Sequence, residues 1–187
     1  MSKKLNRREF TGLCATSLIS AGAVLAASSS APAQSAAPGA APTTGRTVKF
    51  RDGTIVPALG QGSARLGHGK HPQGAEEEAL RTGLALGMTL IDTAEAYGSE
   101  EFIGRAIAGQ RDRVFLVSKV SQTHVAGDGI ARACEASLTR LGTDHLDLYL
   151  LHWPQKAVGL PSTVAAFESL RAKGKIRARG VSLSRFR

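Results

Sequence analysis

Leu90-Ile91-Asp92-Thr93-Ala94-Glu95-Ala96-Tyr97-Gly98-Ser99-Glu100-Glu101 is the stretch that decides the fold. The apolar residues that begin at Met88 lead directly into a carboxylate, Asp92, and a phenol, Tyr97, follows five positions later. A buried strand that carries polar groups at its carboxyl end is typical of parallel α/β sheets, which form their sites at that end. Other strands that end in ionisable groups are therefore expected to share a site with Asp92 and Tyr97.

Strand and helix patterns alternate on both sides of this stretch. A β-hairpin is predicted over 48–56, with its turn at Asp52-Gly53. The predicted strands are 58–62, 89–92, 114–119, 146–152 and 176–182, and the predicted helices are 76–86, 99–108, 128–141 and 162–172. Continuous apolar runs such as Leu148-Tyr149-Leu150-Leu151 indicate parallel strands that are covered on both faces. This alternation predicts a parallel α/β domain with five strand units.

Two of the predicted helices have an apolar face that can be named. Helix 76–86 is expected to turn four residues inward: Ala79, Leu80, Leu84 and Ala85. Helix 99–108 is expected to begin with Ser99 as its N-cap and to bury Phe102, Ile103, Ala106 and Ile107.

Composition narrows the class of protein. The 187 residues suffice for one domain with a sizeable core, but a complete eight-unit α/β barrel has about 250. The 24 Lys and Arg residues exceed the 15 Asp and Glu residues, for a net charge of +9. The basic residues are scattered and form no aromatic-studded stripe, so no nucleic-acid partner is expected, whereas a phosphate-bearing small ligand fits. Cys134 is expected to be a small buried side chain, and with only Cys14 besides, the fold is predicted to need no disulfide.

The amino-terminal region has the composition of a targeting segment. Residues 1–33 predict an export signal, and Arg7-Arg8 followed by Phe10 resembles a twin-arginine signal, which implies the export machinery as a partner and a periplasmic location. An ordinary secretory signal and an uncleaved anchor are the alternatives. The apolar run is interrupted and shorter than the about 20 residues of a membrane span, so no stable membrane anchor is expected. Residues 34–45 are predicted to be a disordered linker, and 46–187 the folded domain.

Three successive predicted strands end in ionisable groups: Asp92, Lys119 and His152. Carboxyl ends of parallel strands meet at one edge, so these groups are expected to gather there with Tyr97. Alone, each has a structural explanation, as a loop cap, a solvated strand end or a hydrogen-bonded core histidine. Together they make a coherent acid–base set, because a phenol with an ordinary pKa of about 10 needs an adjacent cation to act as an acid near neutrality.

In this set Lys119 supplies the cation, Asp92 holds it, and His152 donates a hydrogen bond to a carbonyl oxygen. No Cys/His cluster in the sequence has metal-ligand spacing. His68 and His71 lie close together, but in a Gly/Lys/Pro loop, so no metal is expected. A Gly-x-Gly-x-x-Gly dinucleotide fingerprint is also missing from the sequence. What the set lacks is a hydride donor.

Four motifs resemble the aldo-keto reductase family in their order and spacing: 90–101, 114–119, 146–154 and 180–182. The resemblance implies part of a TIM (β/α)8 barrel, five of eight strand units preceded by a β-hairpin. It implies that Tyr97 is the proton donor, that Lys119 and Asp92 are its tuning pair, and that His152 orients the substrate.

The same resemblance implies a cofactor and a substrate class. NADPH would bind across the barrel mouth and pass a hydride to an aldehyde or ketone. Ser63, Asp92 and Ser182 are the implied cofactor contacts, and His152 and Trp153 the implied substrate contacts.

The chain also departs from the family pattern. Leu183 stands where the family has an asparagine, and Ala64 where an aromatic residue is common. Strands six to eight are not in the sequence, and 183–187 is expected to be a tail foreign to the family. Two interpretations therefore stay open. One is a reductase or a fragment of it, and the other is a non-catalytic half-barrel that folds only by associating with a partner, or with itself, through open sheet edges.

Overall fold

The computed structural model describes residues 46–153 and 159–182. The predicted export signal at 1–33, the predicted linker at 34–45 and the predicted tail at 183–187 lie outside the described residues. Within them, strands, helices and short 3-10 turns follow one another in the predicted alternation.

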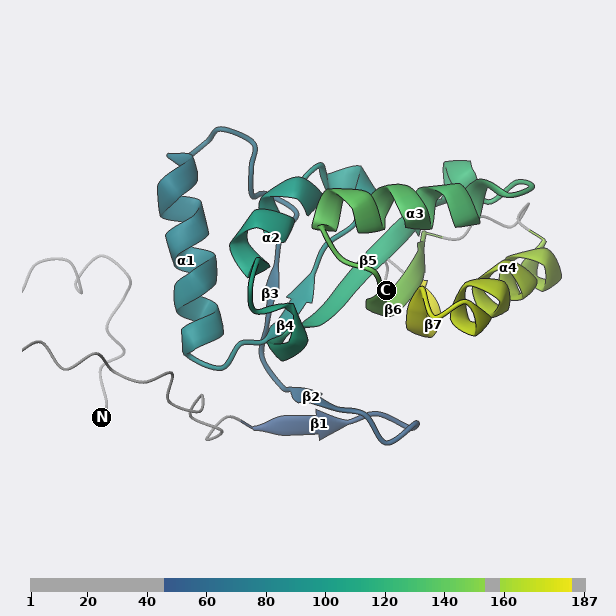
Figure 1. Cartoon of the computed structure of the whole chain (residues 1–187), viewed down its shortest axis with the longest axis horizontal. Coiled ribbons are helices and arrows are strands. Elements are labelled where there is room, and N and C mark those ends of the chain that lie inside the picture. The colour runs from purple at the N-terminus through teal and green to yellow at the C-terminus, as the bar shows by residue number, and fades with distance from the viewer. Residues whose placement is uncertain (1–45, 154–158, 183–187) are drawn as a thin grey trace, which may run out of the picture. The chain divides into compact units, whose positions relative to one another are not determined.

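The described residues begin with the predicted hairpin. Strands β1 (Thr47–Lys49) and β2 (Ile55–Pro57) pair antiparallel (Figure 1). Asp52 accepts a hydrogen bond from the Thr54 amide at 2.9 Å, and Gly53 adopts a φ of +91°, which suits glycine in a tight turn. The Phe50 ring meets the Phe115 ring edge-on at 6.0 Å, so the hairpin packs at the amino end of the next sheet.

Five parallel strands form that sheet in sequential order. They are β3 (Gly60–Gly62), β4 (Leu90–Asp92), β5 (Phe115–Ser121), β6 (Leu146–His152) and β7 (Ile176–Ser182). The predicted parallel α/β class is confirmed, and the bounds of β6 and β7 coincide with the predicted ones.

Helices connect the successive strands. The α-helices are α1 (Gln73–Ala85), α2 (Glu100–Ile107), α3 (Gly129–Leu141) and α4 (Leu160–Ala172). The 3-10 helices are η1 (Glu95–Tyr97), η2 (Arg111–Arg113) and η3 (Gln122–His124). Each α-helix packs on the next one along the chain, as the parallel order of the strands requires (Figure 1).

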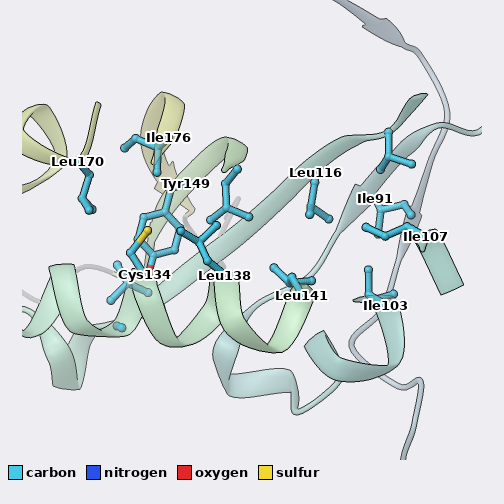
Figure 2. Close-up of a cluster of buried hydrophobic side chains, with 14 of the residues drawn as sticks. Ile91, Ile103, Ile107, Leu116, Cys134, Leu138, Leu141, Tyr149, Leu170 and Ile176 are labelled. Carbon is cyan, nitrogen blue, oxygen red and sulfur yellow. The ribbon is translucent and has the colours of Figure 1, made fainter. Parts of the chain in front are cut away.

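The core lies between the sheet and these helices. Figure 2 shows Cys134, Leu138 and Leu141 of α3 among the side chains of Leu116 and Tyr149 from the strands. All five are at most 3% exposed. Truncating one of the leucines to alanine would cost about 2–5 kcal/mol, so this layer holds the sheet to the helices.

The other face of the sheet is less covered. Strand register places Leu148 beside Val117 and Leu150 beside Lys119 on that face. Both leucines are only partly buried, whereas Tyr149 and Leu151, which alternate with them, are at most 1% exposed. The expectation that the strands are covered on both faces is therefore wrong for β6 within the described residues.

Helix α1 corrects a second expectation. It buries the two leucines of the predicted inward face and exposes the two alanines: Leu80 and Leu84 are buried, Ala79 and Ala85 exposed. Gly83 is also buried, and the Gln61 side chain occupies the space where a Cβ would stand, so glycine lets α1 approach β3 closely at this point. The inward face of α2 is confirmed, since Phe102, Ile103, Ala106 and Ile107 are all buried.

No helix within the described ranges has the length and hydropathy of a membrane span.

Candidate active site

The four residues predicted to share a site come together at the carboxyl end of the sheet. Asp92 ends β4, Lys119 lies in β5, His152 ends β6, and Tyr97 ends η1. The Lys119 ammonium donates to Asp92 Oδ1 at 2.6 Å and to the Tyr97 hydroxyl at 3.4 Å. The rings of Tyr97 and His152 meet edge-on, with centroids 5.6 Å apart. Sequence reasoning therefore identified the cluster correctly, while the role of each member stays a prediction.

Lys119 is the centre of the cluster. It is only 4% exposed, and its ammonium also donates to the Thr93 carbonyl at 2.9 Å. Its three donor directions are thus directed at a carboxylate, a carbonyl and a phenol. The Asp92 side chain is 38% exposed, so the ion pair opens to solvent on its carboxylate side. This arrangement fixes a positive charge next to a phenol oxygen.

His152 is set up to be neutral at ordinary pH. Burial lowers the pKa of His152 below the usual value of histidine, and the charge on Lys119 lowers it further, against the opposing influence of Asp92 and Glu95. A neutral imidazole carries one N–H donor, which can hydrogen-bond an oxygen without competing with Tyr97 as an acid.

The 3-10 helix η1, which carries Tyr97, is joined to neighbouring elements by a residue that sequence reasoning missed. Glu95, two positions earlier in η1, accepts hydrogen bonds from the Ser121 amide at the end of β5 and, at 3.0 Å, from His124 Nδ1 in η3. Gly98 ends η1 with a φ of +67°, a conformation that favours glycine. The carboxylate was visible in the sequence, but its partners lie 26 and 29 residues away, so no local pattern indicated them.

Ser63 belongs to a buried chain of hydroxyl groups. Its Oγ lies 2.9 Å from Ser99 Oγ, which lies 3.2 Å from Thr93 Oγ1. The predicted N-cap position of Ser99 is confirmed, but its side chain makes no capping hydrogen bond to α2, because the hydroxyl bonds to Ser63 and Thr93 instead. The Ser63 side chain is fully buried, and its contact with a cofactor stays a prediction.

Ser182 and Trp153 border the same edge. Strand register places Ser182 beside His152, and the Ser182 carbonyl accepts a hydrogen bond from the Trp153 amide at 3.0 Å. Trp153 is 51% exposed and its ring lies 4.4 Å from that of His152. Both residues therefore lie next to His152 at the carboxyl edge of the sheet, and their contact with a ligand stays a prediction.

The described residues hold no cluster of His, Cys, Asp and Glu that fits a metal ion. Cys134 is fully buried in α3, and burial raises the pKa of its thiol to about 12. A thiol in this environment stays protonated and behaves as a core side chain, as predicted.

Comparison with known proteins agrees with this geometry. Residues 58–186 match the aldo/keto reductase family, so the expectation of a tail foreign to the family at 183–187 is wrong for all but its last residue. This chain belongs to that family. It is 49% identical over 140 residues to the methylglyoxal reductase YeaE of Escherichia coli strain K12, and 43% identical over 139 residues to an aldo-keto reductase of Mycobacterium sp. strain KMS. These matches cover 73% and 72% of this chain and 49% of each relative.

Solved structures of the family show the same relation. The aldo-keto reductase of Klebsiella pneumoniae in complex with NADPH is 49% identical, with a TM-score of 0.69, and the match covers 73% of this chain and 49% of that one. A thermostable aldo-keto reductase in complex with the inhibitor epalrestat is 40% identical, with a TM-score of 0.68, over 73% of this chain and 53% of that one. The chain thus spans about half the length of the aldo/keto reductases it matches.

Proposed function

We propose that this chain carries the proton-donating site of an NADPH-dependent aldo/keto reductase that reduces an aldehyde or ketone to an alcohol, with Tyr97 as proton donor. The observation that carries the proposal is the Lys119 ammonium, 3.4 Å from the Tyr97 hydroxyl and 2.6 Å from Asp92 Oδ1. A cation fixed at that distance stabilises the phenolate that remains when Tyr97 gives up its proton.

The substrate would be held by its carbonyl oxygen. The Tyr97 hydroxyl and the neutral His152 imidazole both donate to that oxygen, which polarises the carbonyl. As negative charge develops on the oxygen, Tyr97 transfers its proton and the alcohol forms. Asp92 keeps Lys119 in place, since the carboxylate and the Thr93 carbonyl both hold the ammonium.

The residues present fit NADPH. The described cluster provides proton donors but no electron donor, and the Klebsiella relative is a complex with NADPH. Ser182 and the exposed side of the Asp92 carboxylate would hold its nicotinamide end, since both lie at the sheet edge beside His152 and Lys119. When bound, NADPH would supply the hydride that this site lacks.

We further propose that the five strands form part of a (β/α)8 barrel, as the family resemblance implies. The parallel order of β3 to β7 and the half-covered face that carries Leu148 and Leu150 support this. The same face supports the alternative, a non-catalytic half-barrel that associates with a partner or with itself.

The test is NADPH-dependent reduction of 4-nitrobenzaldehyde, and of methylglyoxal because a relative is named for it, by the purified chain. Tyr97→Phe should lower kcat by about 10²–10⁴-fold, the usual contribution of a positioned general acid. The matched control is Tyr149→Phe, since the chain has two tyrosines and Tyr149 is fully buried in the hydrophobic core. Unchanged turnover in Tyr97→Phe would refute the role of Tyr97.

Cofactor binding separates the reductase from the half-barrel. NADPH should quench the fluorescence of Trp153, the single tryptophan. Absence of quenching by NADPH, together with a concentration-dependent mass in solution, would favour the half-barrel that only associates.

We propose, from the sequence of residues 1–33, that the protein is exported to the periplasm by the twin-arginine machinery. Replacing Arg7 and Arg8 with lysine in the full chain should retain it in the cytoplasmic fraction. Export that survives this change but stops on deletion of 1–33 would indicate an ordinary secretory signal instead.

A further inference from the structure

A cavity of about 320 Å³ opens directly beside Tyr97. Its other walls come from the loop between β3 and α1: Ala64, Arg65, His68 and Lys70. The volume lies at the small end of the range for ligand sites, about 300–1,000 Å³. Because Tyr97 is one of its walls, a molecule in this cavity would touch the proposed proton donor.

The walls of this cavity are basic. No carboxylate lines it, and Arg65 and Lys70 have no ion-pair partner among the residues that the structure describes. Arg111 and Arg177, by contrast, both bind the carboxylate of Asp147. The positive charge at the cavity is thus left available to a ligand.

Ala64 leaves room for such a ligand. It carries the smallest side chain among the lining residues and stands immediately after Ser63, where the chain leaves β3. The bulk of the wall is therefore provided by the long, exposed side chains of Arg65 and Lys70, which can reach around a bound group.

We propose that the substrate of this site carries an anionic group, a carboxylate or a phosphate, in addition to its carbonyl, and that Arg65 and Lys70 bind this group while the carbonyl lies at Tyr97. The inference depends on the proposed function only for the position of the substrate carbonyl at Tyr97. His68 contributes a further hydrogen-bond donor to the wall of the cavity.

The expected effect is moderate because the cations are exposed. Charge pairs at exposed positions are individually weak, and two or three together would favour an anion over its neutral analogue by about tenfold. The preference should shrink as salt is raised, since the Debye length falls from about 10 Å at 0.1 M to about 3 Å at 1 M.

The experiment measures binding, so it does not depend on turnover. Isothermal titration calorimetry would compare 4-formylbenzoate with its neutral methyl ester, and 4-formylphenyl phosphate would test a phosphate in place of the carboxylate. The variants are Arg65→Gln/Lys70→Gln and the stronger Arg65→Glu/Lys70→Glu. The matched control is Arg81→Glu/Lys173→Glu, which makes the same charge change at two exposed residues outside the cavity.

The anionic aldehydes should bind the wild type about tenfold more tightly than the ester, the preference should vanish in both variants, and the control should keep it. Equal binding of acid and ester by the wild type, or a preference that survives in the glutamate variant, overturns the inference. So does a selective loss of NADPH affinity over NADH affinity in that variant, because the cations would then serve the phosphate of the cofactor. Absence of turnover with intact anion preference would count against the proposed function only.

Discussion

The two ends of the parallel sheet hold buried ion pairs of opposite character. At the amino end, Asp147 is 3% exposed and binds both Arg111 and Arg177, at 2.9 and 2.7 Å. At the carboxyl end, Lys119 pairs with Asp92, whose side chain is 38% exposed. We call the first cluster closed because its carboxylate is buried, although the Arg177 side chain is 67% exposed, and the second open because its carboxylate reaches solvent.

The closed cluster has its polar groups matched. The Arg111 guanidinium donates to Thr143, to the Val114 and His145 carbonyls and to Asp147. Asp147 also accepts from the Leu116 amide at 2.9 Å. Such a cluster stabilises the chain, whereas Tyr97, His152 and Asp92 retain donors and acceptors that a ligand can use. The difference matches the general division of parallel α/β sheets into a stabilising amino end and a functional carboxyl end.

The largest effect on stability is expected at the closed end. Asp147→Ala would leave the buried part of Arg111 and the Leu116 amide without their acceptor, which should lower the free energy of unfolding by about 3–5 kcal/mol. Urea denaturation followed by circular dichroism measures this. The control is Asp144→Ala, because that carboxylate is 91% exposed and its loss should leave the free energy of unfolding nearly unchanged. Equal effects of the two changes would remove the distinction between the two ends.

A smaller effect on stability is expected at the open end. Lys119→Met removes a desolvated ammonium and leaves Asp92 partly solvated, so the free energy of unfolding should change by no more than about 1 kcal/mol. The same denaturation experiment applies, and turnover should fall at the same time because the phenolate loses its cation. A loss of stability as large as that of Asp147→Ala would mean that the ion pair at the carboxyl end also stabilises the fold.

The finest distinction concerns the protonation of His152. Because its pKa is lowered in the folded chain, the free energy of unfolding should decrease progressively as pH falls from the ordinary histidine value of about 6.5 through the lowered value. The protonation of His152 can also be followed directly, because its ring lies 4.4 Å from the Trp153 ring and the imidazolium quenches tryptophan fluorescence. Lys119→Met should move its midpoint upward and Asp92→Asn downward, since the first removes a charge that lowers the pKa of His152 and the second a charge that raises it.

Shifts in the opposite directions would show that the Trp153 signal follows another group. His124→Gln is the control for that case, because His124 is exposed and pairs with Glu95. Its removal should leave most of the quenching in place.

The sequence predicted those features that repeat with a local period. The alternation of strands and helices, the bounds of β6 and β7 and the inward face of α2 follow from apolar periodicity, which is a property of neighbouring residues. The meeting of Asp92, Lys119 and His152 also follows, because parallel strands bring their carboxyl ends to one edge.

Tertiary structure decided what depends on partners far along the chain. Gln61 of β3 lies against Gly83 of α1, the hydroxyl of Ser99 bonds to Ser63 instead of capping α2, and Glu95 joins η1 to the end of β5 through the Ser121 amide. No periodicity encodes such contacts, because a polar side chain takes whichever donor or acceptor the folded chain brings within reach. The sequence by itself therefore determined which chemical groups would share an edge, and only the packing of strands and helices decided how each group is held there.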